Sequence, residues 1–590
     1  MMFAGILLLV TGLLLYAGTL SYGFIELDDP LLITENPAAQ ALTLNNIKTV
    51  FTTYDPELYI PLTFVSYQFD AAIGGLNPFF FHLHNLLQHI LNAWLVVMLA
   101  WMLTRKKPLS VVAGLLFLVH PLQVETVLWA SARKDLLSTT FFLISLILSV
   151  RFIRTRDWKM YGGSIATFLL GLLSKVTVIS LAPVLFLADW IDGKKITRQS
   201  LLEKIPYLIL AVIFGIVALF GKFDAAPVSP LKRILASCTS LVFSMLKVIA
   251  PVHLSPIYAD GGEITLTSPM FFLPLLIVIG VLSGAFLLRK RWKVFSCGVA
   301  FIVLTYAPSF ANIMKGGEYY LTTDRYAYIP LIGIAILAAL AWDAVRMRLE
   351  KKLPADHARG VTYGAAGALL VILGFLSLQQ ANLWRDPLTL SQHVVAVAPN
   401  ARIGHLWRGN VLRDAGQYDE ALEQYRIALS IIDDAQVHYN RGLTYQLQDK
   451  LDDAITDYRK ALELQPVYPL AHINLGQLDY FRGRTEDARK QFEAAAKEAP
   501  QLAMPFYNLG VLEGERKNFE AAAGFYRQAL ERDPALSDAR ANLVIALLAL
   551  GKTAEAVDQL KTTLTMDPEN PTARATLDEL IKAGVVKNGL

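Results

Sequence analysis

The sequence has very little cysteine and no acceptor site for N-linked glycans. Cys238 and Cys297 are the only cysteines in 590 residues, which excludes a disulfide framework and a thiolate metal cluster. No Asn-x-Ser/Thr sequence with a permitted middle residue occurs, because Asn570-Pro571-Thr572 has proline in the middle. This absence is unusual for a eukaryotic secretory-pathway protein of this length and favours a bacterial one.

Net charge is also small. Lys and Arg together number 54 and Asp and Glu number 50, which gives +4. The basic residues are clustered in short segments between apolar runs, where they determine membrane topology, so we expect no nucleic-acid partner. Residues 21–85 form an acidic segment in which Lys48 is the single basic side chain.

Hydrophobic residues are abundant, at 54% of the chain. The mean hydropathy of +0.42 is too high for a protein that is soluble throughout. Residues 1–380 consist of apolar runs, whereas the rest is polar with a helical pattern. Runs of membrane length lie near residues 3–20, 86–103, 109–124, 136–153, 161–174, 176–190, 205–221, 270–288, 295–311, 327–345 and 361–379.

These eleven runs predict a topology. With the amino terminus in the cytoplasm, eleven spans place every basic cluster in the cytoplasm, and the odd number places the polar carboxyl-terminal part outside. Residues 231–250 are apolar but include Lys232, Arg233 and Lys247, and we interpret them as an interfacial or re-entrant helix. The first run lacks the basic beginning of a signal peptide, so we interpret it as a retained span.

The polar part repeats at a regular interval of about 34 residues. Asparagine, glycine, alanine and proline recur at this spacing, at Asn440, Asn474, Asn508 and Asn542, at Gly442, Gly476 and Gly510, at Ala454, Ala488, Ala522 and Ala556, and at Pro466, Pro500, Pro534 and Pro568. This is the tetratricopeptide pattern, in which small residues lie where paired helices touch and proline ends the second helix. We expect about five repeats, which form an array that binds a protein or peptide.

Carboxylates and cations are expected just outside the membrane. Asp28 and Asp29 follow the first apolar run by eight residues and are suited to proton chemistry on lipid-linked substrates, although Asp-Asp-Pro is also a common turn. Arg133, Lys134, Lys175 and Arg325 lie at outer ends of spans. Positive charges on this side are explained by a lipid phosphate or by the nearby carboxylates.

Polar side chains also enter the spans. His82, Asn85 and His89 have the spacing i, i+3 and i+7 and therefore share one face of a helix. Histidines at this spacing are conceivable metal ligands, but no third ligand is identifiable, which favours hydrogen-bonded packing. The same alternatives apply to His120 and Glu125: they contact a substrate or only hold two spans together.

Several fragments, taken in order, resemble the transmembrane and tetratricopeptide repeat-containing O-mannosyltransferase family, whose members have the GT-C fold. The resemblance covers the whole chain. The fragments are Asp28-Asp29-Pro30 with Asn36-Pro37, Tyr59-Ile60-Pro61-Leu62-Thr63, Asn77-Pro78 with His82, Asn85 and His89, His120-Pro121 with Glu125 and Arg133, Ser174-Lys175, and Asp324-Arg325-Tyr326-Ala327-Tyr328-Ile329-Pro330. Family members often have arginine at the position of Ile60.

The resemblance implies an all-α fold, with a polytopic GT-C helix bundle of about eleven spans in residues 1–380, a linker in 381–398 and a tetratricopeptide solenoid in 399–590. It implies an inverting glycosyltransferase that moves a sugar, such as mannose, from a polyprenyl-phosphate donor in the membrane lipid to a hydroxyl of a protein acceptor. No other cofactor is implied, and a divalent metal requirement stays open.

The resemblance also implies roles for single residues. Asp28, with Asp29, would be the general base, and Lys175, Arg325 and then Arg133 would bind the donor phosphate. Further polar residues of the substrate site would be His82, Asn85, His89, His120, Glu125 and Tyr326.

Two other classes of protein compete with this interpretation. One is a non-catalytic membrane scaffold whose repeats assemble a secretion, pilus or polysaccharide-export complex. A scaffold needs a single anchor, whereas charged residues at mid-bilayer cost about 2.5–3.5 kcal/mol each, so many polar spans favour an enzyme. A transporter would also have polar spans, but the internal two-fold repeat of many carriers is not apparent. We expect a bacterial inner membrane protein with periplasmic repeats.

Overall fold

The computed structural model describes residues 2–54, 58–195, 197–221, 228–260, 263–312, 314–315 and 318–582. The chain divides into two compact units, Met1–Val411 and Leu412–Leu590. The division falls beyond the predicted linker, because α16 (Pro387–Val397) and the first residues of α17 (Arg402–Asp414) pack in the first unit.

The predicted all-α fold is confirmed, with one short sheet in addition. Strands β1 (Tyr258–Asp260), β2 (Met314–Lys315) and β3 (Glu318–Thr322) pair antiparallel in the order β1-β3-β2. β3 packs against α11 (Pro230–Ile249). Hydroxyl groups join these elements, because Tyr306 bonds to Ser244 of α11 at 2.6 Å and to Thr322 of β3 at 2.7 Å.

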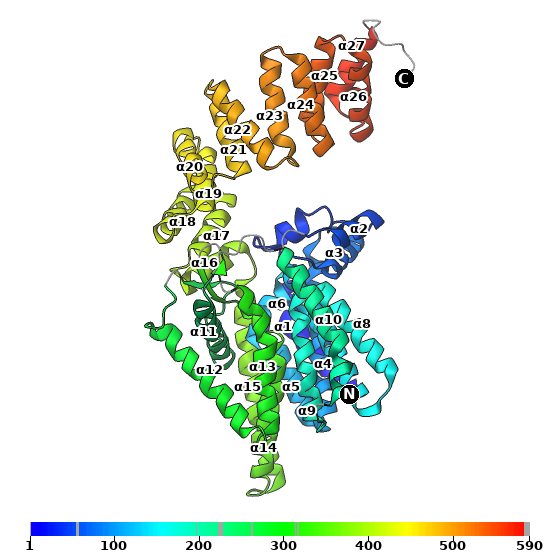
Figure 1. Ribbon diagram of the computed structural model, residues 1–590, viewed down its shortest axis with the longest axis vertical. Helices are drawn as coiled ribbons and strands as arrows, with labels where there is room; N and C mark the ends of the chain where they lie inside the picture. The colour runs from blue at the N-terminus through cyan, green and yellow to red at the C-terminus, as the bar shows by residue number, and fades with distance from the viewer. Residues whose placement is uncertain are drawn as a thin grey trace. The chain divides into compact units, whose positions relative to one another are not determined.

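Every apolar run predicted to span the membrane is helical. The helices are α1 (Met2–Tyr16), α4 (Pro78–Thr104), α5 (Lys107–Val119), α6 (Val124–Leu128), α7 (Arg133–Thr155), α8 (Trp158–Ser174), α9 (Leu181–Ile191), α10 (Arg198–Phe220), α12 (Pro269–Leu288), α13 (Lys293–Tyr306), α14 (Pro330–Leu349) and α15 (Ala355–Leu383). Figure 1 shows α4, α5, α13, α14 and α15 running alongside one another.

Eight helices in the described part of the chain are long and apolar enough to cross a membrane. The count becomes nine if residues 107–119 and 121–128, which are bent by 54°, form one span. Of the remaining predicted spans, α8 has 17 residues and 176–191 is a shorter apolar helix. The chain is therefore a multi-pass membrane protein, while eleven spans and the outward face of α11 stay predictions.

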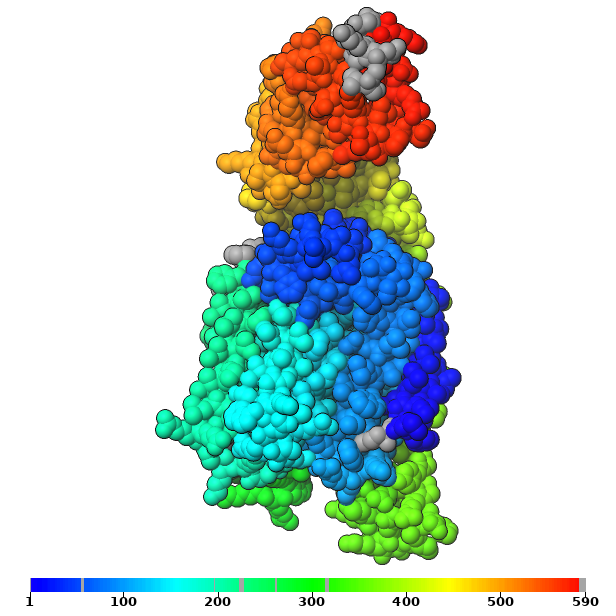
Figure 2. All heavy atoms as spheres, turned by 90° about the vertical axis from the view of Figure 1, so that its right-hand side faces the viewer, coloured from blue at the N-terminus to red at the C-terminus, as the bar shows by residue number. Residues whose placement is uncertain are grey.

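The acidic segment after α1 forms a cap on one end of the bundle. Its helices α2 (Leu44–Thr52) and α3 (Pro61–Gly74) lie over the end at which α4 begins (Figures 1 and 2). α3 packs against α4, α7 and α8, and Thr63 of α3 donates a hydrogen bond to the carbonyl of Ser174 at 3.0 Å. α4 begins at this cap because Asn77 accepts from the N–H of Phe79 and Pro78 has no N–H group that needs an acceptor. We call this the cap end of the bundle.

The second unit is an array of antiparallel helix pairs. After α17, the described residues form α18 (Tyr418–Ile431), α19 (Ala435–Leu447), α20 (Leu451–Leu464), α21 (Pro469–Phe481), α22 (Thr485–Glu498), α23 (Ala503–Glu515), α24 (Phe519–Arg532), α25 (Ser537–Ala549), α26 (Thr553–Met566) and α27 (Pro571–Lys582). Successive helices pack on their neighbours, as the repeat pattern predicts.

The periodic small residues have the expected steric role. A Cβ atom on Gly442 would lie 2.8 Å from the ring of Tyr458, and one on Gly510 would lie 2.6 Å from the ring of Tyr526. Only glycine allows the paired helices to approach so closely around the aromatic ring. The tetratricopeptide architecture is therefore confirmed.

Candidate active site

The first turn of α7 sends three consecutive charged side chains to three different partners at the cap end. Arg133, Lys134 and Asp135 are all buried. Arg133 pairs with Asp70, Lys134 with Asp28, and Asp135 with Lys175. Consecutive residues of a helix point about 100° apart, so one turn serves as the meeting point of α3, the loop after α1 and the segment after α8.

Arg133 has no exposed surface. It pairs with Asp70 of α3, and its Nε donates to Asn85 Oδ1 at 2.7 Å while Nη2 donates to the carbonyl of Phe81 at 2.7 Å. Its guanidinium also lies over the ring of Tyr67, 5.3 Å from the centroid. These contacts hold α3, α4 and α7 together. The guanidinium is enclosed by these partners, and the role predicted for Arg133 at a lipid phosphate stays a prediction.

Asp29 fixes the turn that carries Asp28. Asp29 is fully buried, and its two carboxylate oxygens accept the N–H groups of Ile25 at 2.9 Å and Ser131 at 2.8 Å. Burial raises the pKa of Asp29 to about 6, although both hydrogen bonds oppose the shift. Asp29 has no surface open to a substrate, so its contacts suit it to orienting its neighbour.

Asp28 lies at the accessible side of the same turn. Its side chain is 36% exposed, and its Oδ2 is 3.4 Å from Nζ of Lys134. The side chain of Lys134 is 7% exposed by comparison. Of the two aspartates, one is therefore buried and held by backbone N–H groups, and the other presents its carboxylate to the surroundings, where a reactant can meet it.

Lys175 and Asp135 form the second ion pair of this cluster. Lys175 lies between α8 and the 3₁₀ helix η5 (Val176–Ser180), and its Nζ is 2.5 Å from Asp135 Oδ1. Burial lowers the pKa of Lys175; Asp135 opposes this shift, and the positive charges of Lys134 and Arg325 add to it. The charges of Lys134 and Arg325 therefore act on Lys175. Among the described residues, Oδ2 of Asp135 is buried and has no hydrogen-bond partner.

Arg325 and Glu125 form the third pair. Nη1 of Arg325 lies 2.6 Å from Glu125 Oε1, and the guanidinium lies over the ring of Trp129, 4.6 Å from its centroid. Glu125 is 1% exposed and also accepts from the hydroxyl of Thr323 at 2.5 Å. Arg325 keeps 14% of its side chain exposed, so this pair is not fully enclosed. Tyr326, the next residue, accepts from Asn312 at 3.2 Å.

The polar stripe of α4 packs helices together. Asn85 accepts from Arg133 and donates to the carbonyl of Trp129 at 3.1 Å. His89 bonds to Tyr328 at 2.8 Å and to the carbonyl of Leu118 at 3.1 Å. These contacts match the packing alternative predicted for the stripe. His82, the first residue of the stripe, contacts the loop after α1: Nε2 of His82 is 3.3 Å from the carbonyl oxygen of Gly23.

His120 also makes a contact between segments, and its partner differs from the partners of Glu125. Its Nε2 is 3.0 Å from the carbonyl of Val248, which joins the segment after α5 to the end of α11. Within the described ranges, no three side chains of the histidine, cysteine, aspartate and glutamate types are grouped as metal ligands. The metal requirement that the sequence leaves open is therefore not assigned to any residue.

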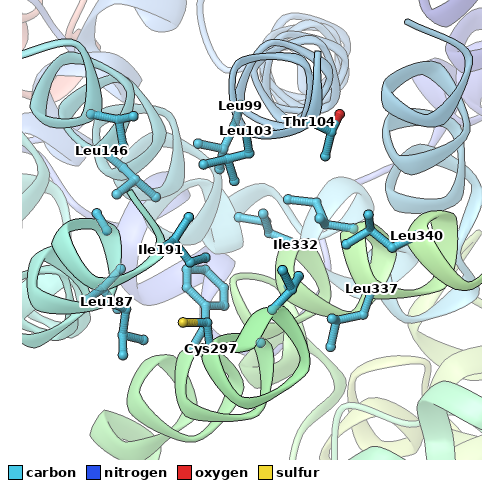
Figure 3. A pocket seen from close by; sticks show the side chains of 18 residues that line it. Leu99, Leu103, Thr104, Leu146, Leu187, Ile191, Cys297, Ile332, Leu337 and Leu340 are labelled. Carbon is cyan, nitrogen blue, oxygen red and sulfur yellow. The ribbon is translucent and has the colours of Figure 1, made fainter. Parts of the chain in front are cut away.

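An apolar cavity of about 150 Å³ lies in the same bundle, away from the cap. Its walls come from α4, α7, α9, α13 and α14, and Figure 3 shows Leu99, Leu146, Leu187, Cys297 and Leu337 around it. Leu146 follows Asp135 by eleven residues on α7, which corresponds to about 17 Å along the helix. One helix therefore contributes both to the charged cluster and to the cavity.

Sequence reasoning missed the role of Asp135 and chose Arg133 over Lys134. All three residues stand at the start of a span, and the sequence does not tell which one faces the bundle. The acidic residue in the first turn of a helix was an available signal, because carboxylates are favoured there. Nothing in the sequence indicates that it pairs with Lys175, which lies beyond the end of the following helix.

Comparison with known proteins gives two kinds of match. The family model for dolichyl-phosphate-mannose-protein mannosyltransferase matches residues 61–220. Tetratricopeptide models match residues 409–449, 435–468, 473–537 and 515–580. The first match contains α7 and Lys175, and the others cover the helix pairs of the second unit.

Curated relatives match over much of the chain. Protein O-mannosyl-transferase Tmtc1 of Drosophila melanogaster is 22% identical over 520 residues, which are 70% of this chain and 60% of that protein. Protein O-mannosyl-transferase TMTC3 of Homo sapiens is 24% identical over 461 residues, 69% of this chain and 48% of that protein. Human protein O-mannosyl-transferase TMTC2 is 32% identical over 165 residues, 26% of this chain and 20% of that protein.

The chain thus spans about half the length of the curated relatives that it matches. The predicted resemblance to the transmembrane and tetratricopeptide repeat-containing O-mannosyltransferases is confirmed. The relatives are named protein O-mannosyl-transferases and match about 70% of the chain, and the mannosyltransferase and tetratricopeptide family models match its two parts.

Proposed function

We propose that this protein transfers a sugar, by kinship mannose, from a polyprenyl-phosphate donor to a hydroxyl group of a protein acceptor. The observation that carries the proposal is the charged cluster at the cap end. It combines a partly exposed carboxylate, Asp28, on a fixed turn with three cations, Lys134, Lys175 and Arg325. A general base beside a set of cations suits a reaction in which a hydroxyl loses a proton while a phosphate leaves.

In this reaction the acceptor oxygen attacks the anomeric carbon as Asp28 takes its proton. The bond between the anomeric carbon and the phosphate oxygen breaks, and the electron pair departs with the polyprenyl phosphate. Attack opposite to the leaving group inverts the configuration at the anomeric carbon. Help from a general base is typically worth about a hundred- to ten-thousand-fold in rate.

The leaving phosphate gains negative charge, and the cations stabilise it. Lys134, Lys175 and Arg325 each have a carboxylate partner and some exposed surface. Held in place before the reaction, they need no reorganisation when the charge develops. Lys134 takes the place in this proposal that the sequence prediction assigned to Arg133, because Arg133 is fully enclosed by its own partners.

The sugar and the lipid tail also find complementary groups. The sugar would lie beside the pair of Lys175 and Asp135, whose side chains keep 13% and 11% of their surface exposed. The hydroxyl of Tyr326 lies in the same region. The apolar cavity along α7, α13 and α14 suits the prenyl chain.

The second unit would recruit the acceptor, because tetratricopeptide arrays bind peptides and proteins. The absence of glycosylation sequons and the predicted topology favour a bacterial inner membrane with periplasmic repeats, and thus an undecaprenyl donor. The rival is a scaffold in which the repeats alone are needed.

The experiment that tests the proposal uses the purified chain in lipid nanodiscs with a radiolabelled polyprenyl-phosphate mannose and periplasmic proteins. Label in an acceptor protein that disappears in Asp28→Asn supports the enzyme. Cells that lose glycopeptides on deletion of the gene, detected by mass spectrometry, identify the acceptor. Wild-type protein that transfers no label, together with a deletion phenotype rescued by Asp28→Asn, would favour the scaffold.

A further inference from the structure

We infer that Trp407 positions the turn that carries Asp28. Trp407 lies on α17, which begins in the first unit and ends at Asp414 in the second. Its indole Nε1–H donates to the carbonyl of Glu26 at 2.7 Å. Glu26 precedes Asp28 by two residues, so this bond connects α17 directly to the proposed base.

Two buried side chains hold the turn by hydrogen bonds to backbone groups. Asp29 accepts from the N–H groups of Ile25 and Ser131. Trp407 donates to the carbonyl of Glu26 and is only 6% exposed. The backbone around Asp28 is thereby fixed, even though the ion pair of its own side chain with Lys134 is long, at 3.4 Å. Preorganisation of a base requires such support, because a displacement of about 1 Å can cost a hundredfold in rate.

The position of Trp407 is itself fixed by strong contacts within the first unit. Glu318 of β3 is fully buried, and its carboxylate accepts the first N–H groups of α17, from Arg402 at 2.6 Å and from Ile403 at 3.0 Å. A carboxylate at a helix amino terminus satisfies unpaired N–H groups and complements the helix dipole. On the other side, Arg408 donates to the carbonyl of Leu388 at 2.6 Å. Trp407 therefore reaches Glu26 from a rigid base.

These contacts assign the start of α17 to the frame of the proposed active site. The tetratricopeptide model that matches residues 409–449 takes in only the last six residues of this helix, 409–414. The inference rests on the proposed function for its kinetic consequence. The anchoring of the turn by Trp407 does not depend on what reaction Asp28 performs.

The test replaces Trp407 by phenylalanine in the full-length chain, which keeps an aromatic ring and removes the N–H donor. The matched control is Trp342→Phe. Trp342 makes the same type of bond, from Nε1 to the carbonyl of Thr362 at 2.9 Å, between α14 and α15. Incorporation of 3-benzothienylalanine at position 407 keeps the indole shape without the N–H and repeats the test if the phenylalanine variant loses its fold.

Two measurements are made in nanodiscs. Hydrogen exchange of peptides covering residues 24–32 should accelerate by about tenfold in Trp407→Phe and stay unchanged in Trp342→Phe. In the transferase assay, kcat should fall by about tenfold while KM for the donor changes less than about twofold. In the Asp28→Asn background, Trp407→Phe should add no further loss, since residues that act through one group are not additive.

Unchanged exchange of residues 24–32 in Trp407→Phe would overturn the inference, and so would a rise in KM with kcat unchanged. A wild-type chain without transferase activity would refute the proposed function, yet faster exchange in Trp407→Phe would still support the anchoring. The two failures are therefore distinguishable.

Discussion

The two adjacent aspartates give the sharpest prediction, because one is buried and the other is partly exposed. Asp28→Asn should remove catalysis and leave the fold intact. Asp29→Asn should weaken the fold and reduce activity only through displacement of its neighbour. The two substitutions change the same atoms in consecutive residues, so each serves as the control for the other.

The expected effects of Asp28→Asn on the free energy of unfolding and on kcat follow from the exposure and the chemistry of this side chain. It is 36% exposed, whereas that of Lys134 is 7% exposed and loses its carboxylate partner at 3.4 Å when Asp28 becomes asparagine. The free energy of unfolding should thus fall, but by less than for a fully buried pair, because water reaches Asp28. Loss of the proton acceptor should lower kcat by about two to four orders of magnitude, which corresponds to about 2.7–5.5 kcal/mol in the barrier.

The expected loss of stability in Asp29→Asn follows from the two hydrogen bonds that Asp29 accepts. Its oxygens accept from two backbone N–H groups in a fully buried site. The asparagine amide keeps one acceptor and places an NH₂ group against the other N–H. One buried donor left without an acceptor costs about 1–3 kcal/mol. We therefore expect lower thermal stability and a moderate loss of kcat.

The assay measures transfer of labelled sugar from a polyprenyl-phosphate donor to an acceptor peptide by protein in nanodiscs, with thermal unfolding of the same samples. An Asp28→Asn protein that retains more than a tenth of wild-type kcat would refute the general-base role. An Asp29→Asn protein as stable as the wild type at pH 4, where the contribution of Asp29 to stability is nearly full, would refute the anchoring of the turn. Equal loss of activity with equal stability in both would mean that the carboxylates act as one unit.

Three further predictions concern pH, the cations and the cavity. Because burial raises the pKa of Asp29 to about 6 in the folded protein, the contribution of Asp29 to stability is full below the unfolded pKa and is lost as the pH rises through 6. Between pH 4 and pH 7, the free energy of unfolding of the wild type should therefore fall by up to about 3 kcal/mol relative to that of Asp29→Asn. A difference between the two proteins that stays constant with pH would contradict this. Lys134→Ala should raise KM for the donor about tenfold with near-normal stability. Arg133→Ala should destabilise by about 3–5 kcal/mol, because the buried Asp70 loses its arginine partner and keeps its hydrogen bond with His84. The reverse order in binding and melting experiments would return Arg133 to the phosphate site. Leu187→Trp should fill the cavity and weaken binding of a long-chain donor more than that of a short-chain analogue, and equal effects in a competition assay would exclude the cavity as the tail site.

The repeat array was predictable from sequence because its constraints are local. Gly442 and Tyr458 lie within one helix pair, and the same contact recurs between Gly476 and Phe492 and between Gly510 and Tyr526. A period in sequence thus reports a period in packing. The membrane helices were predictable for a similar reason, since length and hydropathy are properties of a single segment.

The candidate site was less predictable, because it depends on which face of each helix turns inward. The types of residue were recognised: carboxylates after the first span and cations at span ends. The sequence does not distinguish Arg133 from Lys134, since both stand at the same membrane depth. Only the packing of the helices shows that Arg133 pairs with Asp70 and donates to Asn85. Lys134 is the residue that pairs with Asp28.

The boundary between the two units falls after Val411, beyond the linker predicted at residues 381–398, and this too has a physical reason. A repeat is defined by its helical period, and by that criterion α17 belongs to the array. The contacts of its first turns are with β3, α16 and the loop after α1. A truncated chain that ends before α17 would lose the repeats, and it would also lose Trp407 and the start of α17 that Glu318 caps. Its loss of activity would therefore not isolate acceptor recruitment.

The paired state of the three cations bears on the order of events in the proposed reaction. Buried cations need counter-charges, and before the donor arrives Lys134, Lys175 and Arg325 obtain them from Asp28, Asp135 and Glu125. Asp28 is the most exposed of these carboxylates and has the longest pair, so it is the one that a phosphate displaces most readily. When Lys134 turns to the phosphate, Asp28 is released to accept a proton from the acceptor. Donor binding should therefore precede productive acceptor binding, and initial-rate kinetics that show the acceptor binding first would contradict this sequence.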